Sequence, residues 1–422
     1  MPGPFDGVRI LDLTTVISGP LATMILGDQG ADVIKVEAPN GDYSRHVATR
    51  RGGLSASFLN NNRNKRSIVL DLKSSEGLEV FKRLAANADV VIQNFRPGVV
   101  ERMGIGEDIL RAINPSIVYV SICGFGFSGP YAQKPVFDPL IQAVSGLATV
   151  QAGSDEERPR LVRTILPDKL TAIQASQAIA AALFARERTG EGQHVTLTML
   201  DTVVAFLWSS DMGGHTFVGD EMQKEEAQSF IDLIYETADG FVSVAVMQDK
   251  HWRGLAKALD RPDLLMHKKF KTPELREMNR DERLHMTQEA LKSFKSQDLL
   301  ERLEREDVPC APVLTRRDMR VHPQVVANGT LVETEHPQAG RLRQARHPAR
   351  FSKTAPSVRR CAPLLGEHTR EILIEAGFSA TRISALESSG AAQQAGVKHD
   401  RLSLRANAKW LESRNHARRV WP

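Results

Sequence analysis

Cysteine is scarce in this sequence. Three cysteines occur among 422 residues, at Cys123, Cys310 and Cys361, with neither CxxC nor CxxH spacing. Twelve histidines are scattered without an HxH or HxxxH pair. Disulfide frameworks and structural zinc sites need such clusters. The sequence therefore predicts no disulfide framework and no metal centre, and it favours a reducing, cytoplasmic compartment.

Long apolar runs are also missing. No stretch is both long enough and free enough of charge to span a membrane, so we expect no membrane partner. The first expected strand begins at Gly7, which leaves no room for a cleavable leader. Hydrophobic residues make up 41% of the chain and charged residues 25%, which is typical of a soluble globular protein. The length predicts two domains.

Most of the chain has no excess of either charge sign. The net charge is +4, but residues 391–422 hold seven Lys/Arg against two Asp/Glu, or +5, so the first 390 residues carry −1. A body without a basic field does not favour nucleic acid as a partner. We expect residues 391–422 to be a basic, solvated tail.

Two glycine-containing signatures of other enzyme classes are absent. The first strand-to-helix turn reads "TTVISGPLAT", with one glycine where the fingerprint G-x-G-x-x-G has three. The backbone there cannot approach a pyrophosphate as a nicotinamide site requires, and Glu37 alone is weak evidence for a ribose contact. The absence of GxSxG argues against a serine hydrolase.

Short apolar runs alternate with helical patterns through the first half of the chain. The expected strands are "VRILDL", "ADVIKVE", "KRSIVLDL", "DVVIQNF", "SIVYVSICGFG" and the end of "GEGQHVTLTML". Strands separated by helices predict a largely parallel sheet covered on both faces. The fold class is therefore α/β, with a Rossmann-like parallel sheet in a large domain.

The second half indicates a smaller α+β domain. "LIYETADGFVSVAV" predicts a β-hairpin that turns at Asp239-Gly240, and charged helices follow to about residue 307. The "HPQ" pieces at His322 and His336 look like return connections. The expected organisation is a large domain at 1–210, a linker at 211–228, a small domain at 229–321, a return segment completing the large domain at 322–390, and the tail at 391–422.

Asp168 is the first candidate for chemistry. It follows a proline in "RTILPDKLTAIQASQAIAAAL" and opens a long helix whose many alanines allow another backbone to approach closely. The physics of the residue alone favours a helix N-cap. A carboxylate at a helix amino end is also held ionised by the dipole and the free amides, as a carboxylate nucleophile requires. We expect both roles together.

Three further stretches are candidates because they are expected to follow strands, where open α/β sheets bind ligands. "NNRNKRS" places three basic side chains together, which could bind phosphate groups. "QNFRPGVVERMG" contains one side-chain amide and two arginines. The glycines of "CGFGFSGPY" could bring backbone N–H groups near a ligand. The alternative for each is a solvated basic loop or an ordinary turn. The residues concerned are Arg63, Lys65, Arg66, Asn94, Arg96, Arg102, Gly124, Gly126 and Gly129.

Taken in order, these motifs resemble the family III CoA-transferases, the group that includes formyl-CoA transferase and the CaiB/BaiF enzymes. The resemblance covers roughly residues 5–390. It rests on seven collinear stretches: "GVRILDLTTVISGPLATMILGDQGADVIKVE", "NRNKRSIVLDLK", "ADVVIQNFRPGVVERMGI", "INPSIVYVSICGFGFSGPY", "DPLIQAVSGL", "RERTGEGQHVTLTMLD" and "APLLGEHTREIL".

The resemblance implies a two-lobed subunit whose large domain uses both ends of the chain, and an interlocked homodimer. Coenzyme A or acyl-CoA would bind as substrate, with no permanently bound cofactor and no metal. The other partner would be a carboxylic acid. A small dicarboxylate acceptor with succinyl-CoA as donor is the expected pair.

The resemblance also implies roles for single residues. Asp168 falls on the family's catalytic aspartate, which forms an acyl anhydride and then an aspartyl-CoA thioester. The glycines after Cys123 are candidates for stabilising an oxyanion. The implied CoA-binding residues are Val16, Ile17, Ser18, Leu72, Lys73, Asn94, Phe95, Arg96, Arg102 and Asp138.

Two departures from the family pattern leave alternatives open. Ala38 replaces an arginine that some members carry, and "DMGGHTFVGDEMQKEEAQ" lacks a clear counterpart of the glycine-rich loop of formyl-CoA transferase, which argues against formyl/oxalate specificity. A 2-methylacyl-CoA racemase of the same fold would need a histidine where Phe137 precedes Asp138, because racemisation needs an acid and a base. A non-catalytic CoA-binding protein is the third alternative.

Overall fold

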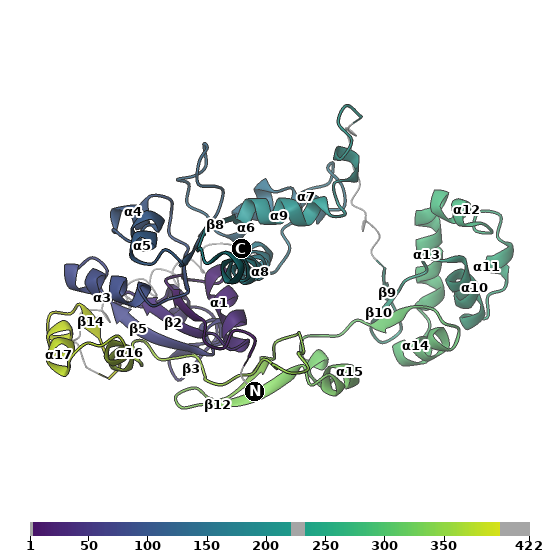
Figure 1. Ribbon diagram of the computed structural model, residues 1–422. Coiled ribbons are helices and arrows are strands. Elements are labelled where there is room, and N and C mark those ends of the chain that lie inside the picture. The colour runs from purple at the N-terminus through teal and green to yellow at the C-terminus, as the bar shows by residue number, and fades with distance from the viewer. Residues whose placement is uncertain (1–2, 221–232, 397–422) are drawn as a thin grey trace, which may run out of the picture. The chain divides into compact units, whose positions relative to one another are not determined.

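The computed structural model describes residues 3–220 and 233–396 (Figure 1). The chain forms two compact units. The large unit comprises Met1–Ala152, Arg158–Glu221 and Val332–Pro422, and the small unit comprises Gly153–Glu157 and Met222–Leu331. The expected tail from residue 397 and the expected linker from residue 221 lie outside the described residues.

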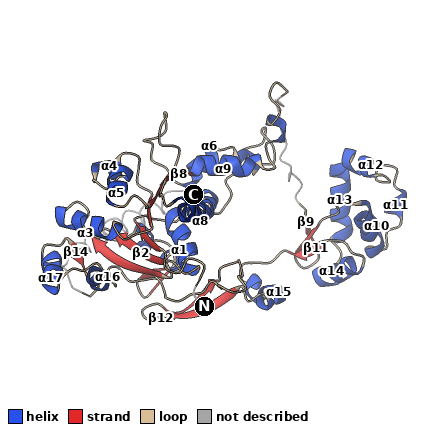
Figure 2. Cartoon of the chain, viewed as in Figure 1, coloured by secondary structure: helices blue, strands red, loops and turns tan. Residues whose placement is uncertain are grey.

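A seven-stranded sheet forms the centre of the large unit (Figure 2). Its order is β14-β5-β2-β1-β6-β7-β8, and every pairing is parallel except the one between β14 and β5. The strands are β1 (Arg9–Asp12), β2 (Asp32–Glu37), β5 (Lys65–Leu70), β6 (Val90–Gln93), β7 (Val118–Cys123), β8 (His194–Thr198) and β14 (Ala392–Gln393). The predicted α/β fold with a mostly parallel sheet is confirmed.

Helices cover both faces of this sheet because successive strand residues point to opposite sides. The helices are α1 (Ser18–Asp28), α3 (Ser75–Ala85), α5 (Glu107–Ile113), α8 (Leu166–Thr189), α16 (Thr369–Glu375) and α17 (Ala380–Ser388). In β1, Ile10 packs toward α1 and α8, whereas Leu11 packs toward α3, α5, α16 and α17. Alanines of α8 lie in the same apolar cluster as Ile10 and Ala22 of α1, which confirms the expected close packing on the alanine-rich helix.

Residues 332–396 belong to the large unit. α16 packs beside β5, and β14 pairs with Leu70 and Val69 of that strand. The "HPQAG" segment is not a plain connection, because it turns between two paired strands, β12 (Leu331–His336) and β13 (Gly340–Ala345). Buried His336 accepts the backbone N–H groups of Gln338 and Ala339 and thereby stabilises this turn.

The small unit has an antiparallel sheet and its own core. The predicted hairpin is confirmed as β9 (Ile234–Glu236) and β10 (Phe241–Val244), with β11 (Cys310–Pro312) on the other side of β10. Trp252, Leu255 and Phe270 lie in its apolar core. Its helices are α10 (Asp249–Ala258), α11 (Asp263–Met266), α12 (Pro273–Met278), α13 (Arg280–Leu291), α14 (Ser296–Arg305) and α15 (Pro323–Ala327), with a 3-10 turn at Asp318–Val321.

Shorter elements connect the main ones in the large unit. They are β3 (Arg50–Arg51), β4 (Leu54–Ser55), α2 (Ala56–Asn61), α4 (Val99–Arg102), α6 (Asp138–Val144), α7 (Leu147–Val150), α9 (Met199–Trp208) and 3-10 turns at Tyr43–His46 and Gly213–His215. Over residues 3–220 and 233–396, no helix combines the length and the apolar character that crossing a membrane would need.

Candidate active site

The turn between β1 and α1 is held from two sides. Val16 has φ +72°, a conformation that costs a β-branched residue free energy unless its surroundings fix it. Asn94, just after β6, accepts the N–H of Thr15 at 3.0 Å and donates to the carbonyl of Thr15 at 2.9 Å. Asp42 accepts the N–H of Val16 at 3.2 Å. The turn therefore has a defined shape where it leads into Ser18.

A buried charge lies beneath this turn. Lys35 of β2 is fully buried, and its ammonium lies 2.9 Å from the Asp42 carboxylate and 2.8 Å from the Thr14 carbonyl. Lys35 therefore ties Asp42 and the start of the turn to the sheet. A lysine among the apolar residues of "DVIKVE" was the sequence signal for this contact, but Lys35 is not among the residues predicted from the sequence.

The basic side chains of "NNRNKRS", expected to bind phosphate, instead form ion pairs inside the protein, so the phosphate-binding prediction is wrong. Arg63 pairs with Asp28, Lys65 with Asp12, and Arg66 with Asp32, Glu371 and Glu375. Arg63, Lys65 and Arg66 are all buried. The reason is their position: Lys65 and Arg66 begin β5 rather than follow it, and their charged groups are already paired with carboxylates of β1, β2 and α16.

A cavity of about 710 Å³ opens at the carboxyl ends of β1, β2, β5 and β6. Thr14 and Thr15 line it from the turn, and Leu72, Lys73 and Phe95 line it from the neighbouring strand ends. Ala38 lies in the same wall, so the departure noted in the sequence falls within the cavity. Its lining combines apolar side chains, such as Leu72 and Phe95, with the charged side chain of Lys73.

Seven of the ten predicted CoA-binding residues lie outside the lining of this cavity. Val16, Ile17 and Ser18 continue the turn from Thr15, and Asn94 holds that turn in place. Arg96 and Arg102 are exposed. Asp138 lies elsewhere, beside Asp168. The structure thus brings three of the ten to the cavity and connects four more to it through the turn, and the CoA-binding role of all ten stays a prediction.

Asp168 lies in the first turn of α8 and is not its N-cap. The cap position is Ile165, and Leu166 and Pro167 begin the helix, because proline is accommodated at the first helical positions. The expected capping role is therefore wrong. The carboxyl group instead lies near Ser18 of α1, whose backbone N–H and hydroxyl lower the pKa of Asp168.

The acidity of Asp168 also differs from the expectation. Burial, and after it the charge of Asp138, raise the pKa of Asp168 to about 6, while the Ser18 hydrogen bonds act in the opposite direction. The idea that the helix end holds this carboxylate firmly ionised is wrong, because desolvation outweighs the dipole. With a pKa of about 6 the group is still mostly ionised at pH 7.

Asp138, the first residue of α6, binds directly to the backbone of Asp168. Its Oδ2 accepts the Asp168 N–H at 3.3 Å, and its Oδ1 accepts the side-chain amide of Gln142 at 2.6 Å. Burial raises the pKa of Asp138. The sequence analysis did not select Gln142, although its i,i+4 spacing from Asp138 on a helix would have indicated the contact.

The glycine-containing loop after β7 packs close to α6. A side chain at Gly124 would meet Val136 at 2.3 Å, so glycine is needed there for the close approach. Burial raises the pKa of Cys123 to about 11, so this thiol is not a thiolate at neutral pH. The oxyanion role of Gly124, Gly126 and Gly129 stays a prediction.

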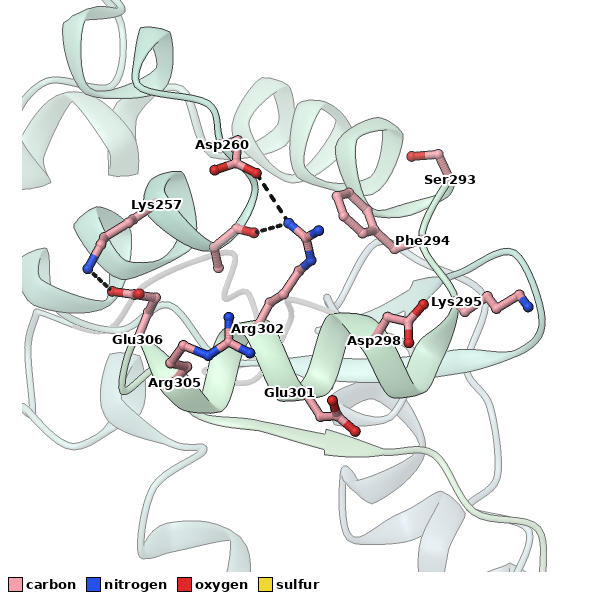
Figure 3. Close-up of a pocket in the computed structure, with 11 residues that line it drawn as sticks. Lys257, Asp260, Ser293, Phe294, Lys295, Asp298, Glu301, Arg302, Arg305 and Glu306 are labelled. Carbon is pink, nitrogen blue, oxygen red and sulfur yellow. Dashed lines mark hydrogen bonds and ion pairs between the residues drawn. The ribbon is translucent and has the colours of Figure 1, made fainter.

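The small unit has a separate hollow of about 650 Å³ (Figure 3). Lys257 pairs with Glu306 at 2.8 Å, and Arg302 pairs with Asp260 at 3.2 Å. Its lining contains as many acidic as basic side chains, so it does not gather charge of one sign for a ligand. Across the described part of the chain, no group of three His, Cys, Asp or Glu side chains is arranged to hold a metal ion.

Comparisons with known proteins agree on one family. The sequence profile of CoA-transferase family III matches residues 5–369. Human succinyl-CoA:glutarate CoA-transferase is 36% identical over 380 residues, covering 88% of this chain and 86% of that protein. Succinyl-CoA:mesaconate CoA-transferase of Haloarcula marismortui is 36% identical over 391 residues, covering 89% and 97%.

More distant matches extend the same picture. Formyl-CoA:oxalate CoA-transferase of Escherichia coli O157:H7 is 30% identical over 413 residues, covering 92% of this chain and 99% of that protein. The crystal structure of a CaiB/BaiF family protein from Brucella suis superimposes with a TM-score of 0.80 at 32% identity, covering 89% of this chain and 100% of that one. The likeness therefore spans both units and nearly the whole described chain.

Proposed function

The chain belongs to CoA-transferase family III, and from that premise we propose that it moves CoA between an acyl-CoA and a carboxylic acid through covalent intermediates on Asp168. One observation carries the proposal. The carboxylate of Asp168 lies near Ser18, at the end of the same turn whose first residues, Thr14 and Thr15, line the cavity. A ligand that fills the cavity and follows the turn is led to this carboxylate.

The proposed reaction has four steps in which each bond broken is matched by one formed. A carboxylate oxygen of Asp168 attacks the thioester carbon, forming a C–O bond and releasing CoA as thiolate. The thiolate attacks the side-chain carbonyl of Asp168, giving an aspartyl-CoA thioester and the free donor acid. The acceptor carboxylate then displaces the thiolate to form a second anhydride. The thiolate attacks the acceptor's acyl carbon, and Asp168 leaves as carboxylate.

The environment of Asp168 suits this chemistry. Partial burial and the nearby Asp138 raise the free energy of the carboxylate anion relative to an acylated, neutral side chain. Attack on the thioester removes the charge from this place, so the reaction relieves the unfavourable interaction. No external energy source is needed, because one thioester is exchanged for another.

CoA is proposed to occupy the cavity at the strand ends. Leu72 and Phe95 offer apolar surface for an adenine ring, and Lys73 offers a charge for a phosphate group. Val16, Ile17 and Ser18 would then follow the pantetheine arm toward Asp168. Asn94 contributes by fixing the turn, and the exposed Arg96 and Arg102 are proposed to meet the phosphates from outside.

We propose a small dicarboxylate as the acceptor and succinyl-CoA as the donor. The relatives at 36% identity are named for succinyl-CoA with glutarate and with mesaconate, which are dicarboxylates.

The active protein is proposed to be an interlocked homodimer. In support, large apolar side chains are exposed on α6, α8 and α9: Leu140, Val144, Ile173, Phe184, Phe206 and Trp208.

A panel of acyl-CoA donors against organic acids, followed by the mass of the product thioester, tests the proposal. We expect transfer from succinyl-CoA to a small dicarboxylate, and a loss of about 10³-fold or more in Asp168→Asn. Asp201→Asn, which changes an exposed acid on α9, is the matched control and should retain activity. Undiminished transfer in Asp168→Asn contradicts the proposal, and deuterium exchange at the α-carbon of 2-methylacyl-CoA would point to a racemase instead.

A further inference from the structure

We propose that Asp138, held by Gln142, is a positioning residue whose negative charge activates the carboxylate of Asp168 and favours its covalent forms. The inference rests on the proposed function and adds a role for a second carboxylate. It replaces the predicted role of Asp138 as a CoA-binding residue.

The geometry of α6 aims Asp138 at α8 rather than at the cavity. Its carboxylate is divided between two partners, with one oxygen on the backbone N–H of Asp168 and the other on the amide of Gln142. Gln142 is buried, and its own amide oxygen accepts the N–H of Val162 at 2.9 Å. Its NH₂ group also lies within 3.4 Å of the Val162 carbonyl and 3.3 Å of the Thr164 carbonyl. The orientation of Gln142 is therefore fixed, and with it the position of Asp138.

Of the two carboxyl groups, Asp138 holds its charge more readily. The amide of Gln142, the N–H of Asp168 and the charge of Lys169 all lower the pKa of Asp138 against the effect of burial. For Asp168, only the N–H and hydroxyl of Ser18 lower the pKa. Two interacting carboxyls titrate as a pair, and the one whose anion has more stabilising partners ionises first.

Charged and titratable groups on the other packed elements leave Asp138 as the carboxyl that ionises first. From α1, Ser18 faces Asp168, and from α8 itself, Lys169 acts on Asp138 while its ammonium donates to the hydroxyl of Thr164. From α9, Asp201 acts on Cys123 of β7. His194 of β8 is engaged with Ser121.

The side chain of Asp168 changes its charge during the reaction, and this change decides the effect of Asp138. In the free enzyme the side chain is an anion beside the Asp138 anion. As anhydride or thioester it is neutral, so the repulsion from Asp138 disappears in every covalent state. Asp138 therefore raises the reactivity of the free carboxylate and increases the share of enzyme that carries the acyl or CoA group. It touches neither substrate nor reacting atoms.

The test is the pH profile of the first half-reaction in Asp138→Asn. Single-turnover release of donor acid from labelled succinyl-CoA, without acceptor, is followed between pH 4 and 8. We expect a wild-type acidic limb near the pKa of about 6, and in the variant a limb moved toward the ordinary aspartate range. The share of enzyme carrying covalent CoA should fall several-fold, while KM for succinyl-CoA stays unchanged.

Asp201→Asn is the matched control, because it removes the same charge from a helix packed against α6 and α8. An unshifted limb and an unchanged covalent share in Asp138→Asn overturn the inference. If that variant does not fold, Asp138→Ser keeps a hydroxyl acceptor for the same N–H. Failure of both to fold would make Asp138 a folding residue and equally overturn the inference. Absence of acid release in the wild type would instead overturn the proposed function.

Discussion

At the scale of single residues, Asp168 combines reactivity with a cost in stability. Its pKa is raised to about 6 from 3.8, so between these values the folded protein binds a proton that the unfolded chain does not. Stability contributed by Asp168 therefore falls as pH rises from about 4 to about 6, and stays low above pH 6. The proposed nucleophile is therefore kept at the expense of folding free energy, as is common at functional sites.

Asp168→Asn should consequently be more stable than the wild type at pH 8. The expected gain in the free energy of unfolding is about 1–3 kcal/mol, because the neutral amide carries no desolvated charge. Denaturant unfolding at pH 8 and at pH 4 measures it, and the difference should nearly vanish at pH 4. An equal or lower stability at pH 8 would contradict the raised pKa.

The sequence predicts Asp168 as the candidate nucleophile, but it does not predict its acidity. The prediction rests on a lone carboxylate after a proline, at the position of the family's catalytic aspartate. Its pKa depends on Asp138, thirty residues away, and on Ser18, from the start of the chain, and neither contact appears in local sequence. The same holds for Lys65, whose partner Asp12 is supplied by another strand.

At the scale of elements, the β1–α1 turn depends on the strand beneath it. Val16 is strained, and the groups that fix the turn come from Asn94, Asp42 and Lys35 on other segments. The position of Ser18, and through it of Asp168, therefore rests on a buried ion pair. Such a pair adds little net stability but is costly to break from one side.

Lys35→Met tests this dependence. It leaves Asp42 buried without its cation and should lower the free energy of unfolding by about 3–5 kcal/mol. Adding Asp42→Asn to the same chain should recover part of the loss, because both members of the pair are then uncharged. Chemical denaturation of the two variants gives the comparison. A single variant as stable as the wild type would show that the turn does not depend on Lys35.

Elements were predictable where their apolar pattern is continuous. β1, β2, β5, β6 and β7 each contain two or more of Val, Ile and Leu and are buried at almost every residue, which is the pattern of a parallel sheet. β12 alternates polar and half-buried residues, and β14 has two residues, so neither carries a local signal. Their pairing is decided by tertiary contacts.

At the scale of the whole molecule, the exposed apolar surface of α6, α8 and α9 needs a partner. Phe184 is 63% exposed and Phe206 48%, on helices whose opposite faces pack in the core. Monomeric proteins rarely leave several large apolar side chains exposed on neighbouring elements. A second copy of the chain is the proposed occupant.

Light scattering coupled to size-exclusion chromatography measures the assembly. We expect the mass of two chains for the wild type and a shift toward monomer or aggregate in Phe206→Asp. Ile374→Asp on α16, 64% exposed in the wild type, is the control and should remain dimeric. A wild-type mass of one chain would contradict the proposed homodimer.

The proposed mechanism requires that Asp168 itself carries the acyl group and then CoA. Incubation with succinyl-CoA and hydroxylamine, followed by peptide mass analysis, detects these intermediates, because hydroxylamine converts an activated aspartyl group into a stable hydroxamate. We expect this mass change at Asp168, and we expect it to be absent when acyl-CoA is omitted. An unmodified Asp168 in protein that is turning over would rule out covalent catalysis on this residue.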